Sequence, residues 1–124
     1  MDEKFRKQLE ENGADVNTTL KRFMGNESLY VKYIIKFLED KNYEGIISNF
    51  EKGDYESVFN NAHGLKGVTA NLGLNPITAA AAKITELLRN KQAQEVDAEK
   101  LNDYIKQLDE AYSRFQRIIE ENKQ

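Results

Sequence analysis

Apolar side chains recur at intervals of three and four residues along almost the whole of this 124-residue chain. This spacing places them on one face of an α-helix, whereas a half-buried β-strand would need apolar and polar residues to alternate. Almost no stretch shows that alternation, and Pro76 is the only proline that could interrupt a helix. The chain is therefore expected to be all-α. The longest apolar stripe consists of Leu101, Ile105, Leu108, Tyr112, Phe115 and Ile119.

Capping residues and glycines predict where these helices begin and end, because Asp and Asn favour N-caps and Gly favours the position after a C-terminus. The expected N-caps are Asp15, Asn26, Asp54, Asn75 and Asp97. The expected helices lie within residues 1–13, 15–25, 26–53, 54–73, 75–89 and 97–122. The third is expected to kink or break near Asn42. Between the fourth and fifth, Gly73 suits a left-handed C-cap, and Pro76 suits the first helical position.

Four of these helices are long and amphipathic, and the connections between them are short. Helices joined by tight turns pack as antiparallel neighbours. We therefore expect an up-down-up-down antiparallel four-helix bundle, with one or two short N-terminal helices across one end. A chain of this length is expected to form a single domain over residues 1–124.

Composition excludes several classes of protein. The absence of cysteine excludes disulfides and thiolate metal sites, and it favours a reducing compartment. A net charge of −3 gives no general attraction to nucleic acid. The charged N-terminus is unlike a signal peptide, and no apolar run is long enough to cross a membrane. We expect a soluble, cytoplasmic protein that binds neither nucleic acid nor membrane.

The helix over residues 54–73 carries His63, the only histidine of the chain. Successive helical residues are rotated by about 100°, so His63 lies about 160° from Leu65, the centre of the apolar stripe. The imidazole is therefore expected to face solvent. Its neighbours on this outer face are Phe59, Asn60, Lys66, Gly67 and Ala70.

Gly64 and Gly67 flank this histidine, although a glycine inside a helix costs roughly 1 kcal/mol relative to alanine. The bare backbone at Gly67 suggests that something approaches the imidazole closely. A metal site is disfavoured by the lack of a second histidine and of cysteine, and no segment matches a Ser-His-Asp arrangement. Two interpretations stay open: an ordinary solvated histidine, or a nucleophile towards a large partner, with Lys66 placed to meet negative charge.

The segment Ala62-His63-Gly64-Leu65-Lys66-Gly67, followed by Asn71-Leu72-Gly73, resembles the A-H-x-L-K-G-x-x-x-x-L-G signature of histidine-containing phosphotransfer (HPt) domains. The resemblance extends from about Asp15 to the C-terminus. It divides the chain into an N-terminal extension, residues 1–14, and an HPt core, residues 15–122. What it implies is a monomeric four-helix bundle that relays phosphoryl groups between receiver domains.

By this resemblance, His63 takes the phosphoryl group on Nε2 from a receiver's aspartyl phosphate and passes it to another receiver. The receivers implied belong to response regulators and to a hybrid histidine kinase. Lys66 would stabilise the phosphoryl charge, and Gly67 would allow close approach. Thr85 occupies the place on the next helix where the family has a polar residue, often glutamine, that orients the imidazole. The residues expected to dock the partner are Phe59, Asn60, Gly64, Ala70 and Thr85.

No cofactor is expected in this chain, because the resemblance assigns the Mg²⁺ to the receiver. The chain has no Gly-rich ATP loop, so it is not expected to be an autonomous kinase. One alternative is a pseudo-HPt adaptor that binds partners without phosphorylation, although such a protein would be free to lose His63. Another is the dimerisation fragment of a histidine kinase, which predicts an acidic residue after the histidine, where this chain has Gly64.

Overall fold

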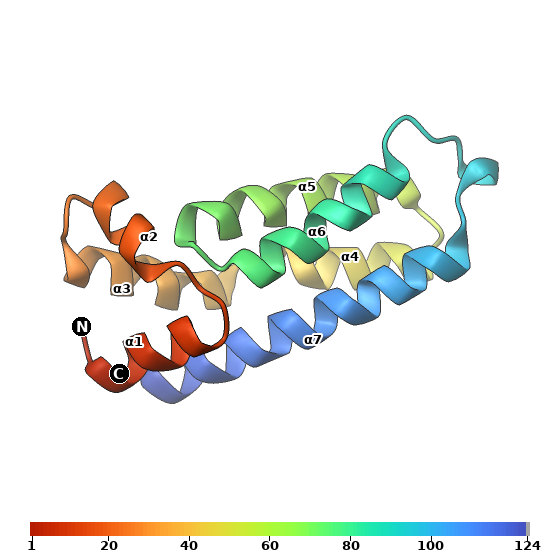
Figure 1. The fold of residues 1–124 in the computed structure, drawn as a ribbon. Helices are drawn as coiled ribbons and strands as arrows, with labels where there is room; N and C mark the ends of the chain where they lie inside the picture. Colours follow the sequence, from red (N-terminus) through yellow and green to blue (C-terminus); the bar gives the residue numbers. More distant parts are fainter. Residues whose placement is uncertain (124) are drawn as a thin grey trace.

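The computed structural model describes residues 1–123, and within them it forms helices and no strands (Figure 1). The helices are α1 (Glu3–Glu11), α2 (Val16–Arg22), α3 (Glu27–Lys36), α4 (Asn42–Glu51), α5 (Tyr55–Leu72), α6 (Asn75–Leu88) and α7 (Ala98–Asn122). Two short 3₁₀ turns, η1 (Phe37–Glu39) and η2 (Ala93–Glu95), lie in the connections.

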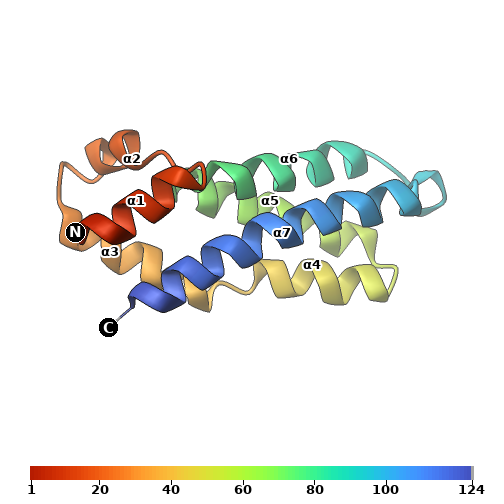
Figure 2. The ribbon, with the colours of Figure 1, turned by 60° about the horizontal axis from the view of Figure 1, so that its bottom comes forward.

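Helices α4 to α7 form the bundle, and each packs against the next along the chain. Helix α3 precedes α4 along the same side of the molecule and contacts α5 and α7, whereas α1 lies beside the C-terminal part of α7 (Figures 1 and 2). Helix α2 packs against α1 and α3 at the same end. The prediction of an all-α bundle with short N-terminal helices at one end is confirmed.

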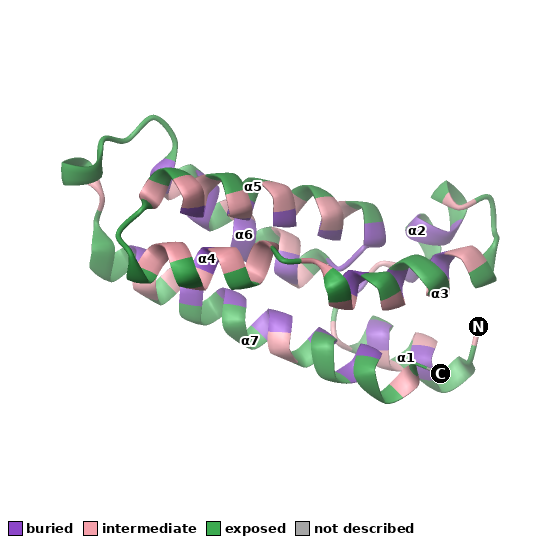
Figure 3. Ribbon diagram, turned by 180° about the vertical axis from the view of Figure 1, so that it is seen from behind, coloured by how far each residue is buried: buried purple, intermediate pink, exposed green. Residues whose placement is uncertain are grey.

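The apolar stripes predicted from the sequence form the core. Every residue of the stripe predicted in α7 is buried, and Leu101, Leu108, Phe115 and Ile119 have no exposed surface. Figure 3 shows how buried faces turn inward while exposed residues cover the outside. In α5 the buried residues are Val58, Ala62, Leu65, Thr69 and Leu72.

The predicted break near Asn42 is present. Helix α3 ends in the turn η1, and Asp40 has extended backbone before α4 begins at Asn42. The Asp40 carboxylate accepts hydrogen bonds from the backbone N–H of Asn42, at 2.9 Å, and from its side-chain amide, at 3.3 Å. The first of these bonds satisfies a free backbone N–H at the start of α4, where the helix has no partner for it.

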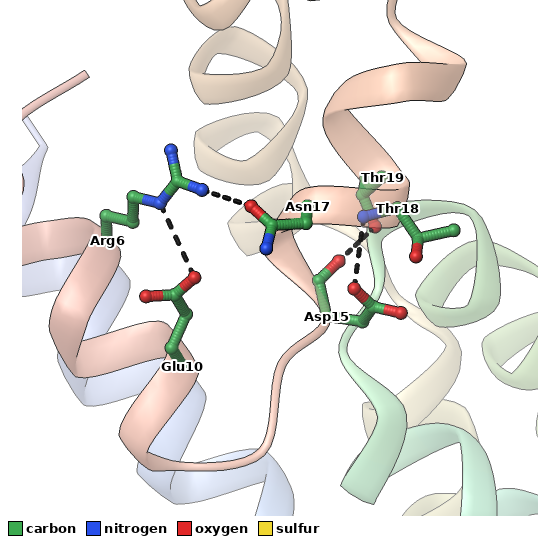
Figure 4. A network of polar contacts seen from close by, with 6 residues as sticks. All are labelled: Arg6, Glu10, Asp15, Asn17, Thr18 and Thr19. Atoms are coloured by element: carbon green, nitrogen blue, oxygen red, sulfur yellow. Dashed lines mark hydrogen bonds and ion pairs between the residues drawn. The ribbon is translucent and has the colours of Figure 1, made fainter.

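Four of the predicted N-caps are confirmed: the side chains of Asp15, Asn26, Asp54 and Asp97 each accept from a backbone N–H of the first turn. At Asp15, the hydrogen bonds from Thr18 hold the pKa of the carboxyl below its usual range. Figure 4 shows this cap beside Arg6, which joins Glu10 of α1 to Asn17 of α2.

The fifth predicted cap, Asn75, is wrong by one residue. Helix α6 begins at Asn75, and Leu74 is its N-cap, without a side-chain hydrogen bond. The Leu74 N–H donates to the Thr69 carbonyl at 3.0 Å, and the Leu74 carbonyl accepts from Ile77 at 3.0 Å. The fully buried Leu74 thus belongs to the end of α5 and the start of α6 at once.

A chain of hydrogen bonds between side chains joins α4 to α5. Asn49 donates to Asn61 at 3.1 Å, Asn61 donates to Asn42 at 3.2 Å, and Asn42 donates to Asp40. Two glycines make room for these amides. A Cβ on Gly45 would lie 2.6 Å from Asn61 Oδ1, and one on Gly64 would lie 3.0 Å from Asn42 Oδ1.

We predict that Gly73→Ala lowers the free energy of unfolding by at least about 2 kcal/mol. Gly73 has a φ of 74°, and a Cβ there would lie 2.7 Å from the Asp15 carbonyl oxygen. The matched control is Gly67→Ala, because Gly67 is helical and nothing lies within 4 Å of its Cβ position. This control should stabilise the protein by about 1 kcal/mol. Urea denaturation measures both, and equal effects of the two substitutions would contradict the prediction.

We also predict that Gly64→Ala stabilises the protein less than Gly67→Ala does, because Asn42 is held in place by its bonds to Asp40 and Asn61. Removing that obstacle with Asn42→Ala should restore the gain, so a double-mutant cycle should give a coupling of about 0.5–1 kcal/mol. A coupling near zero would show that Gly64 does not serve the contact between α4 and α5.

Candidate functional site

His63 lies in the middle of α5 and is exposed, as its place opposite the apolar stripe predicts. Asp54 caps the N-terminus of α5. Its carboxylate accepts hydrogen bonds from the hydroxyl and the backbone N–H of Ser57. These two bonds hold the pKa of the Asp54 carboxyl below its usual range. The imidazole is thus presented to solvent from a well-capped helix that is buried along its opposite face.

The His63 ring rests beside the ring of Phe59. The two rings are nearly parallel, with 9° between their planes and 6.2 Å between their centroids. The guanidinium of Arg89, the residue that follows α6, lies 5.6 Å from the Phe59 centroid. Within residues 1–123 the imidazole has no hydrogen-bond partner. The interaction that the structure gives this ring is the aromatic pair with Phe59.

The other predicted neighbours surround His63 on the same face. Gly67 and Asn60 are exposed, whereas Lys66 and Ala70 are partly covered. Within the described part of the chain, Lys66 forms no ion pair, so its charge is available to a partner. The open space around the Cβ position of Gly67 leaves a gap next to the ring.

Thr85 does not belong to this surface, which corrects the expectation that it docks the partner. Its side chain has no exposed area, and its hydroxyl donates to the Ala82 carbonyl at 2.8 Å. The reason is the antiparallel register of α5 and α6: the bond between Thr69 and Thr78 and the contact between Phe59 and Arg89 place Thr85 opposite the buried Ala62. A hydroxyl in that position cannot meet a partner.

Gly64 lies at the edge of the site, towards α4. The amide of Asn42 occupies the space where its side chain would be. Close packing of α4 thus accounts for this glycine, whereas nothing in residues 1–123 lies within 4 Å of the Cβ position of Gly67. Of the two glycines beside the histidine, Gly64 is therefore packed against α4 and Gly67 faces open space.

A groove of about 830 Å³ lies between α3 and the C-terminal half of α5. Its wall on α5 consists of Val68, Asn71 and Leu72, and Asn71 follows His63 and Gly67 along the same edge of the helix. Tyr33, 44 % exposed, stands 5.7 Å from Phe23, centroid to centroid. The residues that line it are Arg22, Phe23, Leu29, Tyr33, Lys36, Phe37, Glu39, Asp40, Val68, Asn71 and Leu72.

Sequence reasoning missed this groove and Arg89. The groove forms where α2, α3 and α5 come together, and the only local signal for it is an aromatic residue, Tyr33, outside the apolar stripe of its helix. Arg22 helps to build it by donating to the carbonyls of Ala70 and Asn71, at 2.9 and 3.2 Å. Arg89 follows the last residue of α6 and shows no signal in the sequence.

The site offers a nucleophile with a nearby cation and an unobstructed approach. A neutral imidazole carries a lone pair on its unprotonated ring nitrogen. Among residues 1–123, no group of three or more His, Asp or Glu side chains could hold a metal ion. A search of the same residues finds no helix that is both long and apolar enough to cross a membrane. An exposed imidazole with a cation on the same face can act as a nucleophile towards a group that a partner brings.

Comparison with known protein families gives one match that covers nearly the whole chain. The model of the Hpt domain family matches residues 3–118, a range that includes α1 as well as the bundle. No curated protein and no solved structure shows a significant match. The family match includes His63 and the helices on either side of α5. The chain therefore belongs to the Hpt domain family.

Proposed function

We propose that this protein is a phosphorelay intermediate that accepts a phosphoryl group on His63 from one receiver domain and passes it to another. Hpt domains carry phosphoryl groups in phosphorelays and interact with receiver domains. The observation that carries the proposal for this chain is the exposed His63 beside the open backbone of Gly67. The receivers would belong to response regulators and to a hybrid histidine kinase.

The proposed step is an in-line displacement at phosphorus. The lone pair of Nε2 attacks the phosphorus of the receiver's aspartyl phosphate, and an N–P bond forms as the P–O bond to the aspartate breaks. The electron pair of the broken bond leaves with the carboxylate, and the proton on Nδ1 stays in place. Such transfer depends on positioning and on stabilising the charge of the equatorial oxygens. The second transfer is the reverse of this step, with another receiver.

Charge stabilisation would come from both partners. Lys66 lies one turn from His63 on the same face, where a lysine can reach the transferred oxygens as a compact positive charge. We expect Mg²⁺ to be held by the receiver and this chain to need no cofactor of its own. The chain would then act as a carrier rather than as an autonomous kinase. We also propose that it works as a cytoplasmic monomer.

The proposed docking surface begins at the His63 ring and continues over Gly67. Asn60 and Ala70 lie on its two sides, and the groove lined by Phe23 and Tyr33 extends it along α5. Exposed aromatic residues beside a polar rim are typical of protein interfaces. A receiver that reached His63 by way of Gly67 would therefore also contact this groove.

We predict that His63→Gln abolishes phosphorylation. The experiment incubates the protein with receiver domains from the same genome, each phosphorylated with acetyl phosphate. Wild-type protein should take a label that is acid-labile and base-stable, as expected of an N–P bond. The His63→Gln protein should take none, because glutamine has no lone pair on nitrogen that attacks phosphorus.

A label on the His63→Gln protein would contradict the proposal, and so would the absence of label on wild-type protein with every receiver. If wild-type protein binds a receiver but takes no label, the pseudo-HPt adaptor is the better description. Circular dichroism of both proteins controls for folding. Because His63 is exposed, the substitution should leave the helix content unchanged.

We predict that Lys66→Ala and Gly67→Glu separate charge stabilisation from docking. Lys66→Ala should slow transfer roughly tenfold at saturating receiver and leave receiver affinity within about twofold. Gly67→Glu should weaken receiver affinity by more than tenfold, because it fills the gap beside His63 with a charged side chain. Rapid-quench transfer assays and isothermal titration calorimetry measure these two quantities.

Gly67→Ala is the matched control for docking, since it adds one methyl group where nothing lies within 4 Å. Its affinity should lie between those of wild type and Gly67→Glu. An unchanged affinity in Gly67→Glu would remove Gly67 from the docking surface. An unchanged transfer rate in Lys66→Ala would remove the lysine from the chemistry.

A further inference from the structure

A row of four side chains in contact crosses from α6 to α5 and ends at the imidazole. In order, they are Glu86, Arg89, Phe59 and His63. Side chains of a helix lean towards its N-terminus, so the ring of residue 63 naturally lies over residue 59, one turn earlier. The 6.2 Å separation and 9° angle between these rings match an offset parallel stack. Phe59 is therefore in direct contact with the proposed nucleophile.

Phe59 is itself held in place. It is partly buried and packs against the core, and the Arg89 guanidinium lies over its ring at 5.6 Å. Glu86 in turn holds Arg89, by accepting from Nε at 3.3 Å and from Nη2 at 3.1 Å. A cation over an aromatic face is attracted by the ring quadrupole. Two helices thus contribute to the placement of one phenyl ring.

This support matters because the imidazole is exposed. The described residues offer it no hydrogen bond, and the Thr85 hydroxyl is buried and donates to the Ala82 carbonyl. An exposed histidine that was free to rotate would seldom direct Nε2 along the line of attack. Misplacement of a reacting group by about 1 Å can cost on the order of a hundredfold in rate.

We propose that Phe59 is a positioning residue that sets the plane of the His63 imidazole for transfer, and that Arg89 holds Phe59 in place. This inference rests on the proposed function of His63. It gives Phe59 a task different from docking. The proposal distinguishes two properties of the imidazole. Phe59 leaves its chemical reactivity unchanged and controls its orientation.

The test compares Phe59→Leu, which removes the ring, with Phe59→Tyr, which keeps it. Phe50→Leu is the matched control, because Phe50 is another partly buried phenylalanine, on α4. With the receiver that transfers fastest to wild type, Phe59→Leu should lower the transfer rate constant at saturation roughly tenfold. Its receiver affinity should stay within about twofold, and Phe59→Tyr and Phe50→Leu should match wild type in both quantities. Arg89→Gln should give an intermediate rate.

Phosphoramidate, a small phosphoryl donor that needs no docking, measures the reactivity of the imidazole alone. Its rate with Phe59→Leu should stay within about twofold of wild type, since a small donor can approach the ring from many directions. A loss of affinity without a loss of rate at saturation would show that Phe59 only docks the receiver. A Phe59→Tyr protein as slow as Phe59→Leu would also overturn the proposal, because the ring would then not be the relevant feature.

Nuclear magnetic resonance of the unphosphorylated protein keeps this test separate from that of the proposed function. The ring current of Phe59 should shift the carbon-bound protons of the His63 ring, and the shift should disappear in Phe59→Leu but persist in Phe59→Tyr. Unchanged His63 resonances in Phe59→Leu would overturn the placement. If no receiver labels wild-type protein, the proposed function fails, and this measurement still decides whether Phe59 orients the ring.

Discussion

The packing of α5 between α4 and α6 determines where every residue of the site can lie. Val58, Ala62, Leu65 and Leu72 are buried on one side of this helix. Their burial, at roughly 1.5–3 kcal/mol for each large apolar side chain, fixes the rotation of α5 about its axis. His63 faces solvent as a consequence, since it lies on the opposite side of a helix that cannot turn without exposing its core face.

The two glycines beside His63 illustrate how one residue type serves two purposes. Gly64 faces α4, where Asn42 fills the space that a side chain would need, so it allows the two helices to approach. Gly67 faces open space, because no atom of the described residues lies within 4 Å of its Cβ position. Only Gly67 therefore suggests a partner, whereas Gly64 is explained by the bundle itself.

Much of this arrangement could be predicted from the sequence because it depends on local patterns. The stripe of α5, the exposure of His63 and the break near Asn42 follow from apolar spacing and capping residues, which act within a few residues. Thr85 could not be placed in this way, because its orientation depends on the register between α5 and α6. The groove at Tyr33 could not be predicted either, since it exists only where α2, α3 and α5 meet.

The surroundings of the imidazole are asymmetric, and this asymmetry bears on the direction of attack. On the α6 side, the Phe59 ring lies beside the imidazole and the Arg89 guanidinium lies over Phe59. On the opposite side, Gly67 is bare and leads along the helix edge to Asn71 and the groove. An imidazole with one supported side and one open side favours a partner that approaches over Gly67. The same features that restrain the histidine would thus also select the face from which its phosphoryl group arrives.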